Sequence, residues 1–179
     1  MEYDSQSVIS FRLPKIEDGI AIYKLIKQSP PLDLNSSYLY FLQATHFADT
    51  CLLAEKDGEI VGFISGYFRP DGNDSLFIWQ IAVSEKARGQ GLAKRLVYQL
   101  IRNQANRPIV LEVCCTISPS NTVSQNLFKS FAEQHGLIIE KEPFLESRHF
   151  GSDSADSHDA EDLYRIRAAY NDNLVNTLF

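Results

Sequence analysis

The sequence predicts an α/β fold, more narrowly α+β, in which helices flank a mixed sheet of about six to seven strands. Three observations support this fold class. Strand-like segments are interspersed with segments whose apolar residues recur every three or four positions. The sequence Lys56-Asp57-Gly58, between two strand-like segments, is typical of a hairpin turn. A glycine-containing turn, residues 88–93, joins an aromatic and β-branched segment to an amphipathic helix.

The first half of the chain is predicted to hold one short strand, two helices and three antiparallel strands. Pro14 stands where a helix can begin, and Pro30-Pro31 ends that helix. Asn35 or Ser36 can cap the second helix, because the side-chain oxygens of Asn and Ser accept hydrogen bonds from N–H groups of the first turn. The strands are predicted at residues 9–13, 51–55, 59–68 and 77–83.

Helices and strands alternate in the second half. The helix after the glycine turn repeats apolar residues through Leu92, Leu96 and Leu100. The elements that follow are a strand at 109–115, a helix at 121–135, a short strand at 137–139 and an edge strand at 163–167.

A polar and acidic stretch precedes the last strand. Residues 144–162 are irregular in pattern, and a mobile acidic loop is expected at about 146–162. No linker rich in Pro, Gly or Ser divides the 179 residues, so a single domain over 1–179 is expected.

The composition disfavours several classes of partner. A formal net charge of −6 disfavours an electrostatic hold on nucleic acid or on an anionic membrane, since both require a broad basic surface. The chain has neither an apolar run of bilayer length nor a signal-peptide pattern at its start. Three cysteines, two of them adjacent, do not make a disulfide framework. We therefore expect a soluble cytoplasmic protein.

No metal site is expected. The four histidines show no paired spacing of the kind that metal ligands require. They are His46, His135, His149 and His158.

The glycine turn predicts an anion site. A helix start leaves about four backbone N–H groups without intrahelical partners, and a turn without side-chain bulk lets phosphate oxygens reach them. Gly89 and Gly91 supply the clearance and the backbone freedom. Neither the Rossmann pattern nor the Walker A pattern is present, and an ordinary loop is the alternative.

The turn resembles the pyrophosphate-binding motif of the GNAT acetyltransferases, Arg/Gln-x-x-Gly-x-Gly/Ala, with Arg88, Gly91 and Ala93 at the defined positions. The predicted order of elements agrees with the GNAT fold over essentially the whole chain. The resemblance implies a splayed central pair of strands and acetyl-CoA as co-substrate, with the strand before the turn gripping the pantetheine. The implied cofactor-binding residues are Ile81, Ala82, Val83, Arg88, Gly89, Gln90, Gly91, Leu92, Ala93, Asn121 and Ser124.

Two positions depart from the GNAT pattern. Many members carry a glutamate base on the strand before the turn and a tyrosine acid in a helix that reads N-x-x-A-x-x-L-Y, whereas this chain has Trp79-Gln80 and Phe128. Phe128 has no proton to give, and core packing is the preferred interpretation for it. Acetyl transfer to an amine still requires a base or a desolvating pocket, because an aliphatic ammonium has a pKa near ~10.4.

Three residues are candidates for catalysis. Glu161 is expected to take the ammonium proton, directly or through water, with His158 orienting the substrate or sharing the proton. Glu112 is the second candidate, as a proton relay. The alternative for the first pair is a solvated charge run, and for Glu112 a solvated carboxylate on a sheet surface.

Four further segments, residues 30–40, 43–49, 77–80 and 118–121, resemble a branch of the GNAT family that acetylates L-2,4-diaminobutyrate during ectoine synthesis. This resemblance implies direct attack of the side-chain (γ) amine on acetyl-CoA in a ternary complex. The implied substrate-binding residues are Asp33, Tyr38, Trp79, His158 and Glu161. Helix capping is the alternative for Asp33, and core packing is the alternative for Tyr38 and Trp79.

Other functions remain open at this point. The chain can be a GNAT enzyme for another small amine, or a non-catalytic acyl-CoA-binding sensor. Cys114 and Cys115 raise the question of an acetyl-cysteine intermediate, but burial in a strand explains them adequately. Exposed strand edges and family likeness suggest a homodimer.

Overall fold

The computed structural model describes residues 8–107, 109–150 and 158–179 of the 179-residue chain. The strands are β1 (Ser10–Arg12), β2 (Cys51–Lys56), β3 (Glu59–Arg69), β4 (Gly72–Val83), β5 (Glu112–Ile117), β6 (Ile138–Leu145) and β7 (Glu161–Arg167). The helices are α1 (Gly19–Lys27), α2 (Ser37–Gln43), α3 (Leu92–Arg102), α4 (Thr122–His135) and α5 (Leu174–Leu178).

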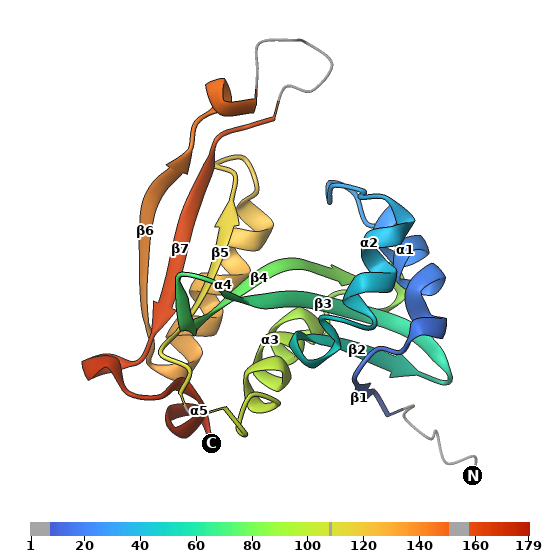
Figure 1. Ribbon diagram of the computed structural model, residues 1–179, viewed down its shortest axis with the longest axis horizontal. Coiled ribbons are helices and arrows are strands. Elements are labelled where there is room, and N and C mark those ends of the chain that lie inside the picture. Colours follow the sequence, from blue (N-terminus) through green and yellow to red (C-terminus); the bar gives the residue numbers. More distant parts are fainter. Residues whose placement is uncertain (1–7, 108, 151–157) are drawn as a thin grey trace. The chain divides into compact units, whose positions relative to one another are not determined.

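The strands of the described residues form a seven-stranded sheet in the order β1-β2-β3-β4-β5-β7-β6 (Figure 1). Most neighbours for which pairs are assigned run antiparallel, whereas β4 and β5 run parallel. The sheet is therefore mixed, and the predicted fold class is confirmed.

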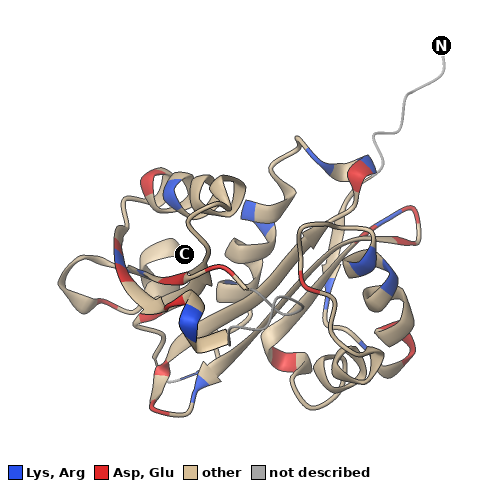
Figure 2. Cartoon of the chain, turned by 90° about the horizontal axis from the view of Figure 1, so that it is seen from above, with Lys and Arg blue, Asp and Glu red and all other residues tan. Residues whose placement is uncertain are grey.

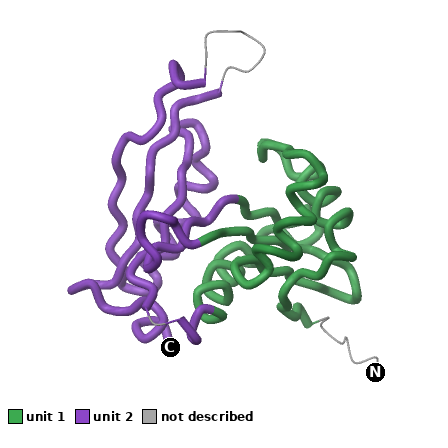
Figure 3. The backbone as a smooth tube through the Cα atoms, viewed as in Figure 1, with its two compact units in different colours: residues 1–67, 80–103 green, residues 68–79, 104–179 purple. Residues whose placement is uncertain are grey.

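The chain divides into two compact units (Figure 3). Unit 1 contains residues 1–67 and 80–103, and unit 2 contains residues 68–79 and 104–179. β3 and β4 contribute residues to both units, so each unit is described by itself below.

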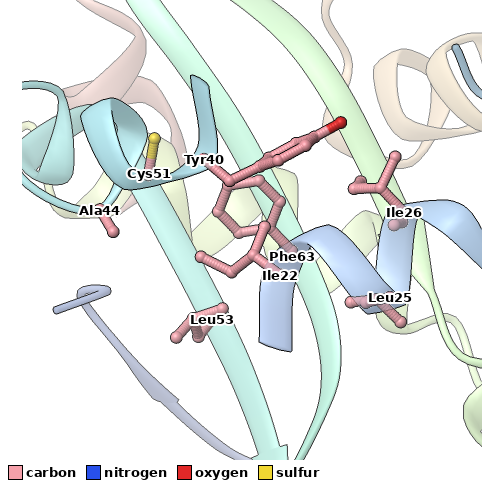
Figure 4. Packing of buried hydrophobic residues seen from close by; sticks show 9 residues of the cluster. Ile22, Leu25, Ile26, Tyr40, Ala44, Cys51, Leu53 and Phe63 are labelled. Atoms are coloured by element: carbon pink, nitrogen blue, oxygen red, sulfur yellow. The ribbon is translucent and has the colours of Figure 1, made fainter. Parts of the chain in front are cut away.

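Unit 1 has helices on both faces of its strands. On one face, α1 and α2 cover β2 and β3 around the buried side chains of Ile22, Tyr40 and Phe63 (Figure 4). On the other face α3 packs against β2 and β3, and Gly62 makes room for it. A Cβ at Gly62 would lie 3.1 Å from a methyl carbon of Leu96 and 3.2 Å from the Cβ of Ala54, so a larger residue would require these neighbours to shift slightly.

Unit 2 contains the only parallel strand pair among those assigned in the described residues. β4 and β5 pair over three positions, from Ser75 opposite Glu112 to Phe77 opposite Cys114. β4 then continues to Val83 and β5 to Ile117. This parallel pairing is short, as expected for a splayed pair of strands. Where two strands do not pair with each other, their backbone N–H and C=O groups are available to a ligand.

The C-terminal strands differ from the prediction in three ways. β7 pairs with β5 on one side and β6 on the other, so residues 163–167 are not an edge strand; β6 is the edge. β6 extends to Leu145 and β7 begins at Glu161, so both take residues from the stretch predicted as irregular. Residues 151–157 of the predicted acidic loop lie outside the described residues.

Long-range pairing explains these differences. β6 is mostly exposed and has little hydrophobic signal of its own. It is stabilised by backbone pairing with β7 and by ion pairs across the two strands, which local sequence patterns do not reveal. These pairs join Lys141 to Asp162, Arg165 to Glu142, and Arg167 to Glu140. The helix α5 was also not predicted, and β5 begins at Glu112 rather than at residue 109.

Candidate functional site

The glycine turn lies in unit 1 between the end of β4 and the start of α3, after a short 3-10 helix at Glu85–Ala87. Gly89 and Gly91 have φ angles of 74° and 68°, which favour glycine. A Cβ at either position would meet no atom within 4 Å, so backbone conformation, and not crowding, requires glycine here. The turn is open to solvent, as a phosphate site requires.

Gly91 is also the N-cap of α3 and offers no side-chain cap to the first turn. The backbone N–H groups at a helix start lack intrahelical partners and carry the positive end of the helix dipole. Leu92 is buried and fixes the start of the helix, while Gln90 is exposed and Ala93 is half-buried. This geometry suits a diphosphate bound by backbone amides.

The end of β4 is held in place from two sides. The backbone N–H of Ser84 donates to the carbonyl oxygen of Val61 at 2.9 Å, and Arg88 Nε donates to the carbonyl oxygen of Val83 at 3.2 Å. The Ala82 side chain lies in the unit 1 core, and Ile81 is half-buried. Arg88 therefore closes the turn onto the strand that precedes it.

Asn121 and Ser124, the other predicted cofactor contacts, lie in unit 2 at the start of α4. The Asn121 side-chain oxygen accepts a hydrogen bond from the Ser124 backbone N–H at 3.0 Å, so Asn121 is the N-cap of this helix. Phe128 is 3% exposed, which confirms core packing. The helix thus provides no tyrosine acid at this position.

His158 and Glu161 lie together at the start of β7 in unit 2. His158 Nδ1 is 3.9 Å from Glu161 Oε1 and 2.8 Å from the carbonyl oxygen of Asp159. A carbonyl oxygen only accepts, so Nδ1 carries a proton and Nε2 has the lone pair of the neutral ring. The His158 ring stacks on Phe150 at 4.4 Å between centroids, which fixes its plane. This pair can exchange protons with a bound amine.

Glu112 lies away from the His158–Glu161 pair. It lies opposite Arg167 in the β5–β7 ladder, whereas Glu161 is at the other end of β7, six residues or roughly 20 Å along the strand. Its carboxylate accepts from Ser75 Oγ at 2.6 Å and from Arg165 at 2.9 Å. Glu112 therefore joins an ion-pair network on unit 2, and this position does not favour a relay. Figure 2 shows where Lys and Arg and where Asp and Glu lie along the chain.

The predicted acceptor residues are at the protein surface. Tyr38 is 69% exposed and Trp79 is 46% exposed, so neither is a core aromatic. Asp33 is exposed, and the N-cap residue of α2 is Ser36. Asp33 and Tyr38 belong to unit 1, and Trp79 belongs to unit 2. All three side chains are at positions where a ligand can meet them.

In the sequence, Gln80 stands out only as a departure from the family pattern. In the structure it is 6% exposed, and its side-chain nitrogen donates to the backbone carbonyl of Asp33 at 2.7 Å. This burial could have been predicted from the sequence. Side chains two positions apart in a strand lie on the same face, so the polar Gln80 shares the face of the core residue Ala82.

The three cysteines are free thiols with raised pKa values. Burial raises the pKa of Cys51 to about 12, and it raises the pKa of Cys114 and of Cys115 as well. A thiol is nucleophilic as the thiolate, so this environment disfavours an acetyl-cysteine intermediate. Burial of the thiols therefore favours direct transfer to the amine over transfer through a cysteine.

Over the described residues, no group of three or more His, Cys, Asp or Glu side chains is arranged to hold a metal ion. Among the helices that the structure describes, none combines the length and the apolarity that a bilayer crossing requires.

Residues 20–132 match the Acetyltransferase (GNAT) family. The L-2,4-diaminobutyric acid acetyltransferase of Vibrio parahaemolyticus is 48% identical over 157 residues, which cover 87% of this chain and 84% of that protein. The protein of the same name from Halomonas elongata is 42% identical over 164 residues, 89% of this chain and 81% of that protein.

A solved structure is similar over almost the whole chain. It is the diaminobutyrate acetyltransferase EctA from Paenibacillus lautus in complex with its substrate L-2,4-diaminobutyric acid and coenzyme A. The TM-score is 0.85 at 36% identity, and the match covers 93% of this chain and 98% of that chain.

Burial of the thiols predicts their reactivity. In the folded protein at pH 8, a thiol reagent such as DTNB is expected to modify less than one thiol per chain within minutes, because burial raises the pKa values and blocks access. Unfolding in guanidinium chloride should release all three. Rapid modification of one thiol per folded chain, prevented by acetyl-CoA, would contradict direct transfer.

Proposed function

The chain belongs to the GNAT acetyltransferase family, and on this premise we propose that it transfers an acetyl group from acetyl-CoA to the γ-amine of L-2,4-diaminobutyrate. The product is N4-acetyl-L-2,4-diaminobutyrate, an intermediate of ectoine biosynthesis. One observation carries the proposal: the fold matches, along almost its whole length, an enzyme solved with both this diamino acid and coenzyme A.

Binding of acetyl-CoA is assigned to the glycine turn and its strand. The backbone N–H groups of residues 89–93 hold the diphosphate, and the open positions at Gly89 and Gly91 let its oxygens approach. The backbone of residues 81–83 pairs with the pantetheine amides, and this orients the thioester. Asn121 and Ser124 remain candidates for contacts from unit 2.

The amine needs help to react, because its ammonium form has a pKa near ~10.4 and dominates at neutral pH. Glu161 takes one proton from the γ-ammonium, directly or through water, and His158 orients the amine or shares the proton. The neutral nitrogen then attacks the thioester carbon and the carbon–sulfur bond breaks. The nitrogen of the new amide loses its second proton to solvent.

The leaving group needs less help than the nucleophile. A thiol has a pKa of about 8.5, so coenzyme A can depart as a thiolate and be protonated afterwards by solvent. This accounts for an active enzyme with Phe128 in place of a tyrosine acid.

Recognition of the acceptor is assigned to exposed groups that suit cations. Asp33 pairs with an ammonium group, and the faces of Tyr38 and Trp79 attract ammonium groups through cation–π contact. We assign the α-ammonium to Asp33, which leaves the γ-amine as the reacting group.

The same proposal includes the cellular compartment and the oligomeric state of the enzyme. Three free thiols are consistent with a reducing cytoplasm, and the acidic net charge of −6 is compatible with a salt-stressed cell that makes an osmoprotectant. A homodimer is proposed because the edge strand β6 is exposed along most of its length.

The proposed activity is tested with purified protein, acetyl-CoA and a panel of diamines. Release of coenzyme A is expected to be fastest with L-2,4-diaminobutyrate, with the acetyl group on the γ-nitrogen as located by NMR. Preference for another amine would favour the alternative GNAT substrate class. Binding of acetyl-CoA without turnover of any amine would favour the acyl-CoA sensor.

The role of Glu161 is tested by Glu161→Gln, which keeps the shape and removes the base. We expect kcat to fall by about 10²-fold or more and the acidic limb of the pH–rate profile to disappear. Glu140→Gln is the control, because this β6 carboxylate is 54% exposed and paired with Arg167. A pH–rate profile of Glu161→Gln equal to that of the unaltered enzyme would exclude Glu161 as the base.

A further inference from the structure

The loop between α1 and α2 is held by two buried side chains within unit 1. Gln80 Nε2 donates to the carbonyl oxygen of Asp33 at 2.7 Å, and the backbone N–H of Asn35 donates to the hydroxyl of Tyr40 at 3.2 Å. Tyr40 is fully buried and Gln80 is 6% exposed. The backbone on both sides of Leu34 is therefore tied to rigid elements, although Asp33 itself is exposed.

The orientation of the Gln80 amide follows from this contact. A backbone carbonyl only accepts hydrogen bonds, so the amide nitrogen must face Asp33 and the amide oxygen must point away. That oxygen, Gln80 Oε1, is buried and has no hydrogen-bond partner among the described residues. A buried acceptor without a donor destabilises the folded protein, whereas methionine would fill a similar volume without an unpaired acceptor.

Gln80 also links the loop between α1 and α2 to β4, the strand that leads into the glycine turn. It is adjacent to residues 81–83 of β4, which the proposed function assigns to the pantetheine. A strand rises about 3.3 Å per residue, so residues 81–83 lie within about 10 Å of Gln80 along the same strand. Asp33 is tied to that strand through the hydrogen bond from Gln80. The Ala82 side chain, in the core, prevents this part of β4 from shifting.

We propose that Gln80 is a positioning residue of the acetyl transfer, which fixes the backbone of Asp33 so that its exposed carboxylate meets one ammonium group of the diamino acid. This inference rests on the proposed function and adds to it a residue that need not touch the substrate. The hydrogen bond from Gln80 sets where the cation binds relative to the thioester.

The test is Gln80→Met, with Gln80→Glu as a second variant. Methionine keeps the volume, and glutamate keeps the shape but replaces the N–H donor with an acceptor that the Asp33 carbonyl repels. For both variants we expect the KM for L-2,4-diaminobutyrate to rise at least tenfold and the KM for acetyl-CoA to stay within twofold. A purely structural role would change both KM values together.

Gln43→Met is the matched control. Gln43 is 2% exposed, lies in unit 1, and has no hydrogen-bond partner for either side-chain atom among the described residues, so this variant changes a buried glutamine without touching the Asp33 loop. Its KM values are expected to stay within twofold of those of the unaltered protein. A tenfold rise in the KM for the diamino acid with this variant would overturn the specific role of Gln80.

A double-mutant cycle with Asp33→Asn decides whether Gln80 acts through Asp33. In the Asp33→Asn background, Gln80→Met is expected to change the KM for the diamino acid by less than twofold, because no carboxylate remains to be positioned. Additive effects, or an unchanged KM for Gln80→Met in an otherwise active protein, would overturn the inference. If the unaltered protein does not acetylate the diamino acid, the proposed function fails first.

Discussion

The proposed cofactor site depends on how β4 passes into α3, where residues 88–91 of the glycine turn are exposed to solvent. Gly89 and Gly91 adopt left-handed backbone conformations there, and Gly91 caps the helix without a side chain. The helix start therefore keeps its hydrogen-bond donors and the positive end of its dipole for an anion. Arg88 and the Ser84–Val61 contact hold the turn against the sheet, so the donors are oriented before the ligand arrives.

β4 organises the rest of the proposed chemistry. Its first residues pair with β5, its last residues lead into the anion site, and Gln80 between them holds the Asp33 loop. In the proposed mechanism, the remaining step that requires side chains is removal of a proton from the amine. Glu161 and His158 are the groups assigned to it, whereas Glu112 is occupied by Ser75 and Arg165.

The features that could be predicted from the sequence are those encoded locally. Helical spacing, the Asp57-Gly58 hairpin and the glycine turn each depend on a few consecutive residues. The order of β7 and β6 depends on pairing between distant strands, and β6 has almost no hydrophobic pattern. The contact between Gln80 and Asp33 spans 47 positions, so spacing along the chain gave no sign of it. Phe128 was assigned correctly to the core because its alternative required a hydroxyl that phenylalanine lacks.

Calorimetric titration of Gly91→Ala and Gly58→Ala with coenzyme A measures whether backbone amides around Gly91 hold the diphosphate. Both glycines have positive φ angles and open surroundings, so alanine should cost each protein a similar amount of stability, about 1–2 kcal/mol. We expect Kd to rise at least tenfold for Gly91→Ala and to stay within twofold for Gly58→Ala, which changes only the β2–β3 hairpin. Equal affinities for the two variants would contradict this expectation.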